Sequence, residues 1–209
     1  MPPELRERFP VLILLVLITC TSIYDWTYGL ESWMAVPLDI TRAWESALTG
    51  DFSGSVIGDL ASALGAAFLH ADAGHLIGNF LFLWIFGAVV SDLVGWKWFA
   101  TIYIITAIGG SLGQLALNPY DSIPGLGASG AVMGLGGAYL GLSVQKERPM
   151  AHVWPLARPV SPVEIGAVGI AKIAMDFMGV FGPDVSNIAY GAHIGGFVAG
   201  VLLVLFRRS

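Results

Sequence analysis

Three residues with the chemistry for hydrolysis each stand at the beginning of an apolar segment. They are His75, Ser129 and His193, which lie far apart in the sequence. Serine hydrolysis requires a hydroxyl nucleophile, a base within hydrogen-bond reach and donors for the developing oxyanion. The pattern predicts that Ser129 is the nucleophile and that His193 is the base that accepts its proton.

Donors for an oxyanion are found at two of these segments. His75 and Asn79 are spaced i, i+4, so a helix presents both side chains on one face. The backbone N–H of Ser129 adds a third donor, because the first N–H groups of a helix have no partner inside the helix and favour negative charge. We expect an oxyanion hole formed by His75, Asn79 and Ser129.

Each residue alone has a plainer explanation. Serine often replaces glycine where membrane helices touch, and a histidine can be hydrogen-bonded between helices.

Other classes of hydrolase do not fit the sequence. A soluble hydrolase would carry Gly-x-Ser-x-Gly, but position 131 is Ala. A zinc protease would carry His-Glu-x-x-His, but His70 and His75 are five apart with no glutamate between them. We therefore expect no metal site.

The composition indicates a membrane protein. The 209 residues are 56% hydrophobic and only 12% charged, whereas soluble domains carry about 25% charged residues. The mean hydropathy is +0.74, so the lipid bilayer is an expected partner. The net charge of −5 comes without a basic patch and argues against nucleic acid as a partner. Cys20 is the only cysteine, which excludes an internal disulfide.

The apolar segments predict an all-α polytopic fold in one domain, residues 1–209, with six membrane spans. A span needs about 20 residues. A long outer loop, about 29–74, follows the first span, and we expect short helices at the membrane surface within it, around 39–44 and 58–64. The predicted spans are about 9–28, 75–94, 97–117, 127–145, 162–180 and 190–207.

The basic residues predict the orientation of these spans. With the N-terminus inside, eight of the ten Lys and Arg residues lie in inner segments, Arg42 lies outside and Lys172 lies within the fifth span. Inner loops are enriched in Lys and Arg. Both termini are then cytoplasmic. His75, Ser129 and His193 all begin spans that run from outside to inside, so the site faces the outer side.

Stripes of glycine indicate where two of these spans touch. Gly130, Gly134, Gly137 and Gly141 share one face of the fourth span, and Gly196 and Gly200 follow His193 on one face of the sixth. Small residues let helix backbones approach closely. We expect these faces to pack together and to bring His193 to Ser129.

Three motifs in order resemble the rhomboid family of intramembrane serine proteases. Gly127-Ala-Ser129-Gly130 is similar to the GxSG motif, His75-Leu-Ile-Gly-Asn79 to the HxxxN motif and Ala192-His193-Ile-Gly-Gly196 to the AHxxG motif. The resemblance covers about residues 65–205. It implies a Ser–His dyad that cleaves transmembrane protein substrates near the outer membrane boundary, without metal or organic cofactor. Six spans with mostly short loops between them indicate that the protein lies in a prokaryotic plasma membrane.

One position departs from the family pattern. Family members often carry an aromatic residue four positions after the serine, and this chain has Met133 there. A thioether can also contact a ring favourably, by roughly 0.3–1.5 kcal/mol.

Two other functions remain open at this point. The first is an inactive relative that binds membrane proteins, although the chain keeps both Ser129 and His193. The second is a small transporter, whose best support is Lys172 and Asp176 at i, i+4 spacing in the fifth span. The segment 179–190 flanks the predicted site from outside, and we expect it to be a mobile cap.

Overall fold

The computed structural model describes residues 8–145, 151, 160–180 and 189–206. Within these ranges the chain is helical, and the only β pairings are two isolated bridges. The predicted cap lies largely outside them. The helices are α2 (Phe9–Tyr28), η1 (Glu31–Trp33), α3 (Pro37–Leu48), α4 (Gly54–Gly65), η2 (Ala66–Phe68), α5 (Ala73–Val94), α6 (Trp96–Leu117), α7 (Ser129–Gln145), α8 (Pro162–Val180) and α9 (Tyr190–Leu205).

The predicted spans correspond to α2 and α5–α9, with ends that move by a few residues. The described part contains three helices long and apolar enough to cross a membrane, which are α2, α5 and α6. The α7 and α9 helices are apolar but shorter. The all-helical fold class is confirmed. The two short helices expected in the 29–74 segment are α3 and α4.

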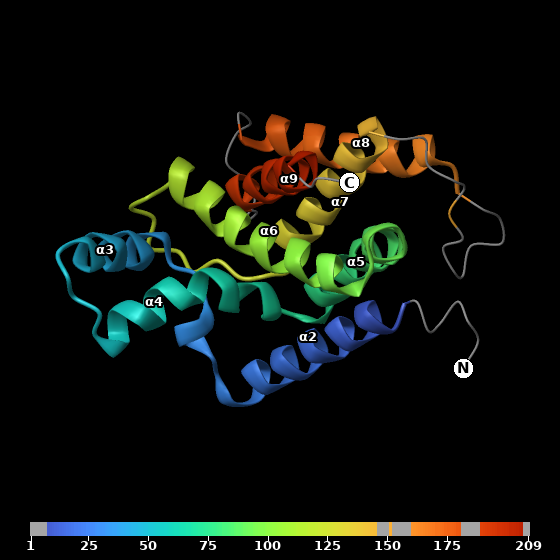
Figure 1. The fold of residues 1–209 in the computed structure, drawn as a ribbon. Coiled ribbons are helices and arrows are strands. Elements are labelled where there is room, and N and C mark those ends of the chain that lie inside the picture. Colours follow the sequence, from blue (N-terminus) through green and yellow to red (C-terminus); the bar gives the residue numbers. More distant parts are fainter. Residues whose placement is uncertain (1–7, 146–150, 152–159, 181–188, 207–209) are drawn as a thin grey trace.

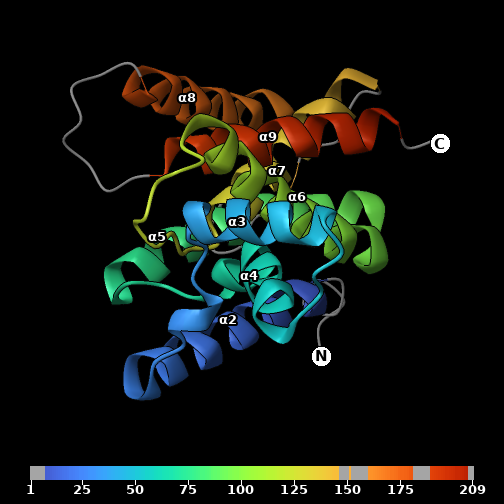
Figure 2. The ribbon, with the colours of Figure 1, turned by 90° about the vertical axis from the view of Figure 1, so that its left-hand side faces the viewer.

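The helices are arranged around α7. In both ribbon views α2 lies at the bottom and α8 and α9 lie at the top, with α5, α6 and α7 between them (Figures 1 and 2). The most extensive packing is between α7 and α9, followed by α6 and α9. Large apolar side chains fill the centre, among them Leu83, Phe86, Phe99, Tyr103 and Tyr139.

The glycines on α7 and α9 lie in the contact between these helices. A Cβ atom built on Gly130 would lie 3.2 Å from the Ala192 carbonyl oxygen, and one on Gly196 would collide with the Gly130 carbonyl. Gly137 and Gly200 meet backbone of the facing helix in the same way, while Gly134 meets Thr106 of α6. The two backbones therefore touch over several turns, which only side chains as small as hydrogen permit.

The segment between α2 and α5 is attached to the loop that leads to Ser129. Ala35 and Gly125 exchange two backbone hydrogen bonds, of 2.9 and 2.8 Å. On α3, which begins at Pro37, the Thr41 hydroxyl donates to the Pro119 carbonyl at 2.9 Å. These contacts hold the chain between α6 and α7 in place before it enters the site.

Candidate active site

An aspartate at the start of α5 positions the first predicted donor. The Asp72 carboxylate accepts a 2.8 Å hydrogen bond from the His75 N–H, which makes Asp72 the N-cap of the helix. Asn79 lies one turn further and is 7% exposed. Its Nδ2 donates to the His75 carbonyl at 3.1 Å, which leaves its second N–H for another acceptor.

Gly127 brings the His75 ring and the Ser129 hydroxyl to the same point. A Cβ atom built on Gly127 would lie 2.7 Å from His75 Cε1, 2.8 Å from His75 Nε2 and 3.8 Å from Ser129 Oγ. The residue also has φ +129°, which L side chains rarely adopt. The ring of His75 therefore packs directly on the Gly127 backbone, beside the predicted nucleophile.

The two residues before Ser129 are held by hydrogen bonds from outside α7. The Gly127 N–H donates to the Ala66 carbonyl at 2.9 Å, and the Ala128 N–H donates to His70 Nε2 at 3.4 Å. Ser129 begins α7, so its own N–H has no carbonyl partner within the helix. This is the position at which an oxyanion donor was predicted.

His70 is a fully buried histidine behind the site. Its Nδ1 lies 3.1 Å from Ser22 Oγ of α2, and because Nε2 accepts from Ala128, the ring hydrogen is assigned to Nδ1. Its ring meets that of His75 edge-on, with centroids 5.1 Å apart. Burial, together with a smaller effect of His75, lowers the pKa of His70 to about 4. His70 lies in the loop before α5, and it connects α2 to the backbone of Ala128, just before Ser129.

His193 lies in the first turn of α9, where that helix contacts the start of α7. The ring is 7% exposed, and the preceding Ala192 carbonyl packs on Gly130. In the described part of the chain no hydrogen bond joins Ser129 Oγ to the His193 ring. Catalytic hydrogen bonds are often long without substrate and tighten in the complex. Lys172 Nζ of α8 lies 3.3 Å from His193 Nδ1.

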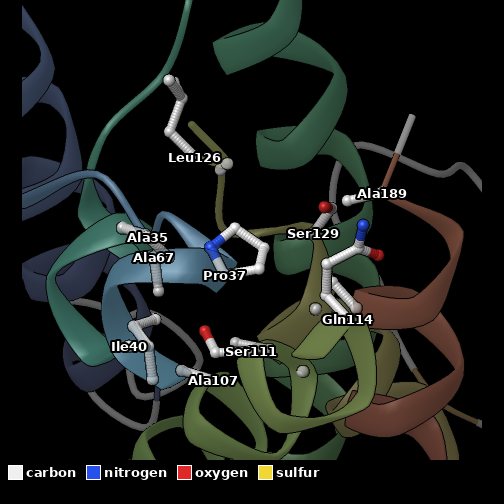
Figure 3. A pocket seen from close by; sticks show the side chains of 17 residues that line it. Ala35, Pro37, Ile40, Ala67, Ala107, Ser111, Gln114, Leu126, Ser129 and Ala189 are labelled. Atoms are coloured by element: carbon white, nitrogen blue, oxygen red, sulfur yellow. The ribbon is translucent and has the colours of Figure 1, made fainter. Parts of the chain in front are cut away.

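A cavity of about 60 Å³ opens beside Ser129. Figure 3 shows Ser129 and Gln114 along one side of it, with Pro37 and Ile40 of α3 across from them. The lining is otherwise made largely of alanine and glycine, so the space admits a few water molecules or one small side chain. Within the described residues, the buried Oε1 of Gln114 has no hydrogen-bond partner.

The comparison with known proteins decides the family. The Rhomboid domain matches residues 57–209. This chain belongs to the rhomboid family. It is 34% identical over 132 residues, 63% of this chain, to the Bacillus subtilis protein named Rhomboid protease GluP, and this match covers 23% of that protein. Rhomboid membership together with the apolar helices makes the chain an integral membrane protein.

Two mitochondrial relatives match similar portions. The chain is 33% identical over 150 residues to Rhomboid protein 1, mitochondrial, of Saccharomyces cerevisiae, with 68% of this chain and 40% of that protein covered. It is 30% identical over 167 residues to RHOMBOID-like protein 12, mitochondrial, of Arabidopsis thaliana, with 72% and 47% covered. The chain thus spans less than half the length of these rhomboid relatives.

Three residues of the site were not assigned a role in it from the sequence. Asp72 had a usable signal, because an Asp three residues before His75 is a common N-cap pattern. His70 and Lys172 gave no such signal, because their partners are 58 and 21 residues away in sequence.

Met133, the position that departs from the family pattern, is buried, 3% exposed, one turn along α7 from Ser129.

Proposed function

We propose that this chain is an intramembrane serine endopeptidase that cleaves transmembrane protein substrates by a Ser129–His193 dyad. One observation carries the proposal. The His75 ring, the Ser129 hydroxyl and the first turn of α9 converge beside a small cavity, although they come from three separate helices. Rhomboid membership supports the same chemistry.

In the proposed first half-reaction, Ser129 Oγ attacks the scissile carbonyl carbon while its proton passes to His193 Nε2. The tetrahedral oxyanion is held by the Ser129 N–H, by His75 Nε2 and by the remaining N–H of Asn79. When the C–N bond breaks, His193 returns the proton to the leaving amine. Losing one such donor typically costs about 10²–10³-fold in kcat.

In the second half-reaction, water hydrolyses the acyl-enzyme with His193 again as base. The buried Gln114 Oε1 is an acceptor that can hold this water at the cavity. The small, alanine-lined cavity suits a small substrate side chain at the cleaved bond. A helical substrate must unwind before attack, since its backbone is otherwise shielded.

The proposal includes the placement of the enzyme. It has six spans, both termini in the cytoplasm and the site toward the outer face of a membrane, which we propose to be a prokaryotic plasma membrane. The eight basic residues of the inner segments support this orientation. No cofactor is needed for the steps above.

The test is cleavage of a generic single-span substrate by the purified protein in detergent. Wild type should cleave it. Ser129→Ala and His193→Ala should each lose several orders of magnitude in rate, since dyad residues act as a unit. Equal cleavage by wild type and both variants would reject the proposal. Binding of the substrate without cleavage by wild type would favour the inactive relative instead.

The contact made by Lys172 bears on the transporter alternative. The described structure directs this lysine to His193 of the proposed dyad. The side chain of Asp176, its i+4 neighbour on α8, lies outside the described part. This contact places Lys172 beside the proposed base.

A further inference from the structure

A groove of about 550 Å³ lies between α2 and α4, and it shares no lining residue with the cavity beside Ser129. In both ribbon views α4 lies next to α2 (Figures 1 and 2). The α4 helix packs on η1 and η2, and α2 packs on η2, so the two short helices join α2 and α4 around this space. Its size is typical of small-molecule sites. The residues of this α2–α4 groove include Leu17, Thr21, Trp33, Gly58, Ala61 and Phe68.

The α2–α4 groove opens on the side of α2 that lipid covers. The α2 helix is long and apolar enough to cross a membrane. Leu17, which lines the groove, is 50% exposed, and Ile13 and Val16 on the same helix are 45% and 60% exposed. In an integral membrane protein such apolar side chains contact lipid tails, which are as apolar as leucine. The groove is therefore continuous with the lipid interface of α2.

The shape of the groove favours a narrow occupant. A helix is about 10 Å across and rises about 5.4 Å per turn, so this volume holds roughly one turn of it. Trp33 also closes one end, because a Cβ atom built on Gly65 would lie 3.3 Å from Trp33 Cβ. A lipid acyl chain is a single file of methylene groups and can follow an irregular groove. An empty groove would lose dispersion contacts along both walls.

Two carboxylates lie near the end of the groove where α2 stops. Asp25 Oδ1 accepts a 2.7 Å hydrogen bond from the Leu30 N–H, and Glu31 begins the short helix that contains Trp33. Trp26 lies on the same stretch of α2, and tryptophan is enriched at the level of lipid headgroups. Neither Lys nor Arg is among the residues that line the groove. These charges favour a lipid with an ammonium headgroup over an anionic lipid.

We propose that the α2–α4 groove binds one acyl chain of a zwitterionic phospholipid, whose ammonium group lies toward Asp25 and Glu31. The chain fills the space that α2 and α4 leave open. It also covers a contact between α2 and the segment before α5, in which the Thr21 hydroxyl donates to the Phe68 carbonyl at 2.7 Å. Thr21 and Phe68 both line the groove. This binding does not depend on whether the chain cleaves a substrate.

Photocross-linking of the purified full chain in phosphatidylglycerol nanodiscs tests the site. The probe is a trace of phosphatidylethanolamine that carries a diazirine in one acyl chain, and mass spectrometry locates the cross-links. We expect them to concentrate on residues 17–21 and 58–68. Labelling spread evenly over the exposed sides of α2, α5 and α6 would overturn the inference, since it would report only the general lipid layer.

A matched pair of substitutions separates groove lipid from surface lipid. Gly58→Phe fills the groove, because a Cβ atom at Gly58 meets nothing within 4 Å. Gly54→Phe is the control, since Gly54 is also on α4 with open space at its Cβ but does not line the groove. Gly58→Phe should lose most of the groove labelling and Gly54→Phe should keep it, with equal helical content by circular dichroism. Unchanged labelling in folded Gly58→Phe would contradict the site.

The headgroup is tested by comparing the same probe with a phosphatidylglycerol that carries the diazirine. Wild type should prefer phosphatidylethanolamine, and Glu31→Gln should reduce this preference by roughly fivefold, the usual effect of one charge at headgroup level. Glu45→Gln, at an exposed position on α3, should leave it unchanged. Equal labelling of wild type by the two lipids would refute the headgroup assignment.

The competing occupant is a second copy of the chain. A benzophenone amino acid in place of Ala61 should cross-link to lipid in the nanodiscs. Cross-linking to a second chain would show that the groove is a protein interface, and the lipid proposal would then be wrong.

Discussion

At the residue scale, the site depends on one position that tolerates no side chain. Gly127 lies against the His75 ring with Ser129 Oγ nearby. A methyl group there would push the ring away from the proposed oxyanion, and its backbone conformation is also strained for any other residue.

Gly127→Ala should therefore lower kcat by about 10²-fold or more, the typical effect of losing one oxyanion donor, while the protein still folds. The control is Gly50→Ala, because Gly50 also has a positive φ (+91°) but nothing within 4 Å of its added Cβ. Cleavage rates of the two variants make the comparison. Equal activity would mean that the His75 ring does not contribute to catalysis.

His70 makes the stability of the site depend on pH. Its pKa is about 4 in the folded protein against a usual 6.5, so the unfolded chain binds the proton more readily. Stability from this residue is fully present above pH 6.5 and falls as the pH drops toward 4, by at most about 3 kcal/mol.

The pH dependence should flatten in His70→Gln, with a lower Tm than wild type at pH 7.5. Thermal unfolding in detergent between pH 4 and 7.5 measures it. Both proteins share every other titratable residue, so the difference between the two curves isolates His70. Parallel curves would show that His70 is not buried neutral.

Sequence reasoning reached some of these residues and not others, for a physical reason. The sequence assigned roles to Ser129, His75 and His193 because each stands at the start of an apolar run. A polar side chain is costly to place there, so it usually has a function. The burial of His70 depends on Ser22 and Ala128, which only the folded chain brings to it. Lys172 was assigned to Asp176, its neighbour on α8, because contacts between helices cannot be read from one segment.

At the element scale, the geometry of the site depends on the close approach of α7 and α9. Periodic glycines predicted which faces meet, since a stripe at helical spacing has one orientation. The same periodicity could not give the partner of every glycine. Gly134 packs its backbone against Gly200 of α9, as expected, but its own Cβ position faces Thr106 of α6, which the pattern did not predict.

Gly196→Ala should destabilise the protein by about 1–3 kcal/mol, the usual cost of overpacking, because its Cβ would meet the Gly130 carbonyl. It should also reduce cleavage by moving His193. Gly78→Ala on α5 is the matched helical control, with nothing within 4 Å of the added Cβ. Thermal unfolding of both variants tests this. An equal Tm would mean that the helices do not pack as described.

At the scale of the whole molecule, the proposed reaction needs the site on a defined side of the membrane. The positions of the helices followed from hydropathy, and the described elements agree with them to within a few residues. The orientation of the helices across the membrane is predicted only from the distribution of Lys and Arg residues. The internal contacts of the fold are the same in both orientations.

Membrane-impermeant maleimide labelling in cells tests that orientation. Cys20 is an exposed free cysteine, so it is first replaced by alanine. A cysteine introduced at Asp51, between α3 and α4, should be labelled in intact cells. One at Lys97, in the first turn of α6, should be labelled only after permeabilisation. The reverse pattern would place the site on the cytoplasmic side.

The central claim is that Ser129 is a nucleophile activated by His193, and the most direct measurement is fluorophosphonate labelling located by mass spectrometry. It requires nucleophile, base and oxyanion hole but no knowledge of the substrate. The account predicts labelling of wild type at Ser129, and labelling slower by at least about 10²-fold in His193→Ala. Absence of labelling in folded wild type, or labelling at Ser129 that is equally fast without His193, would contradict it.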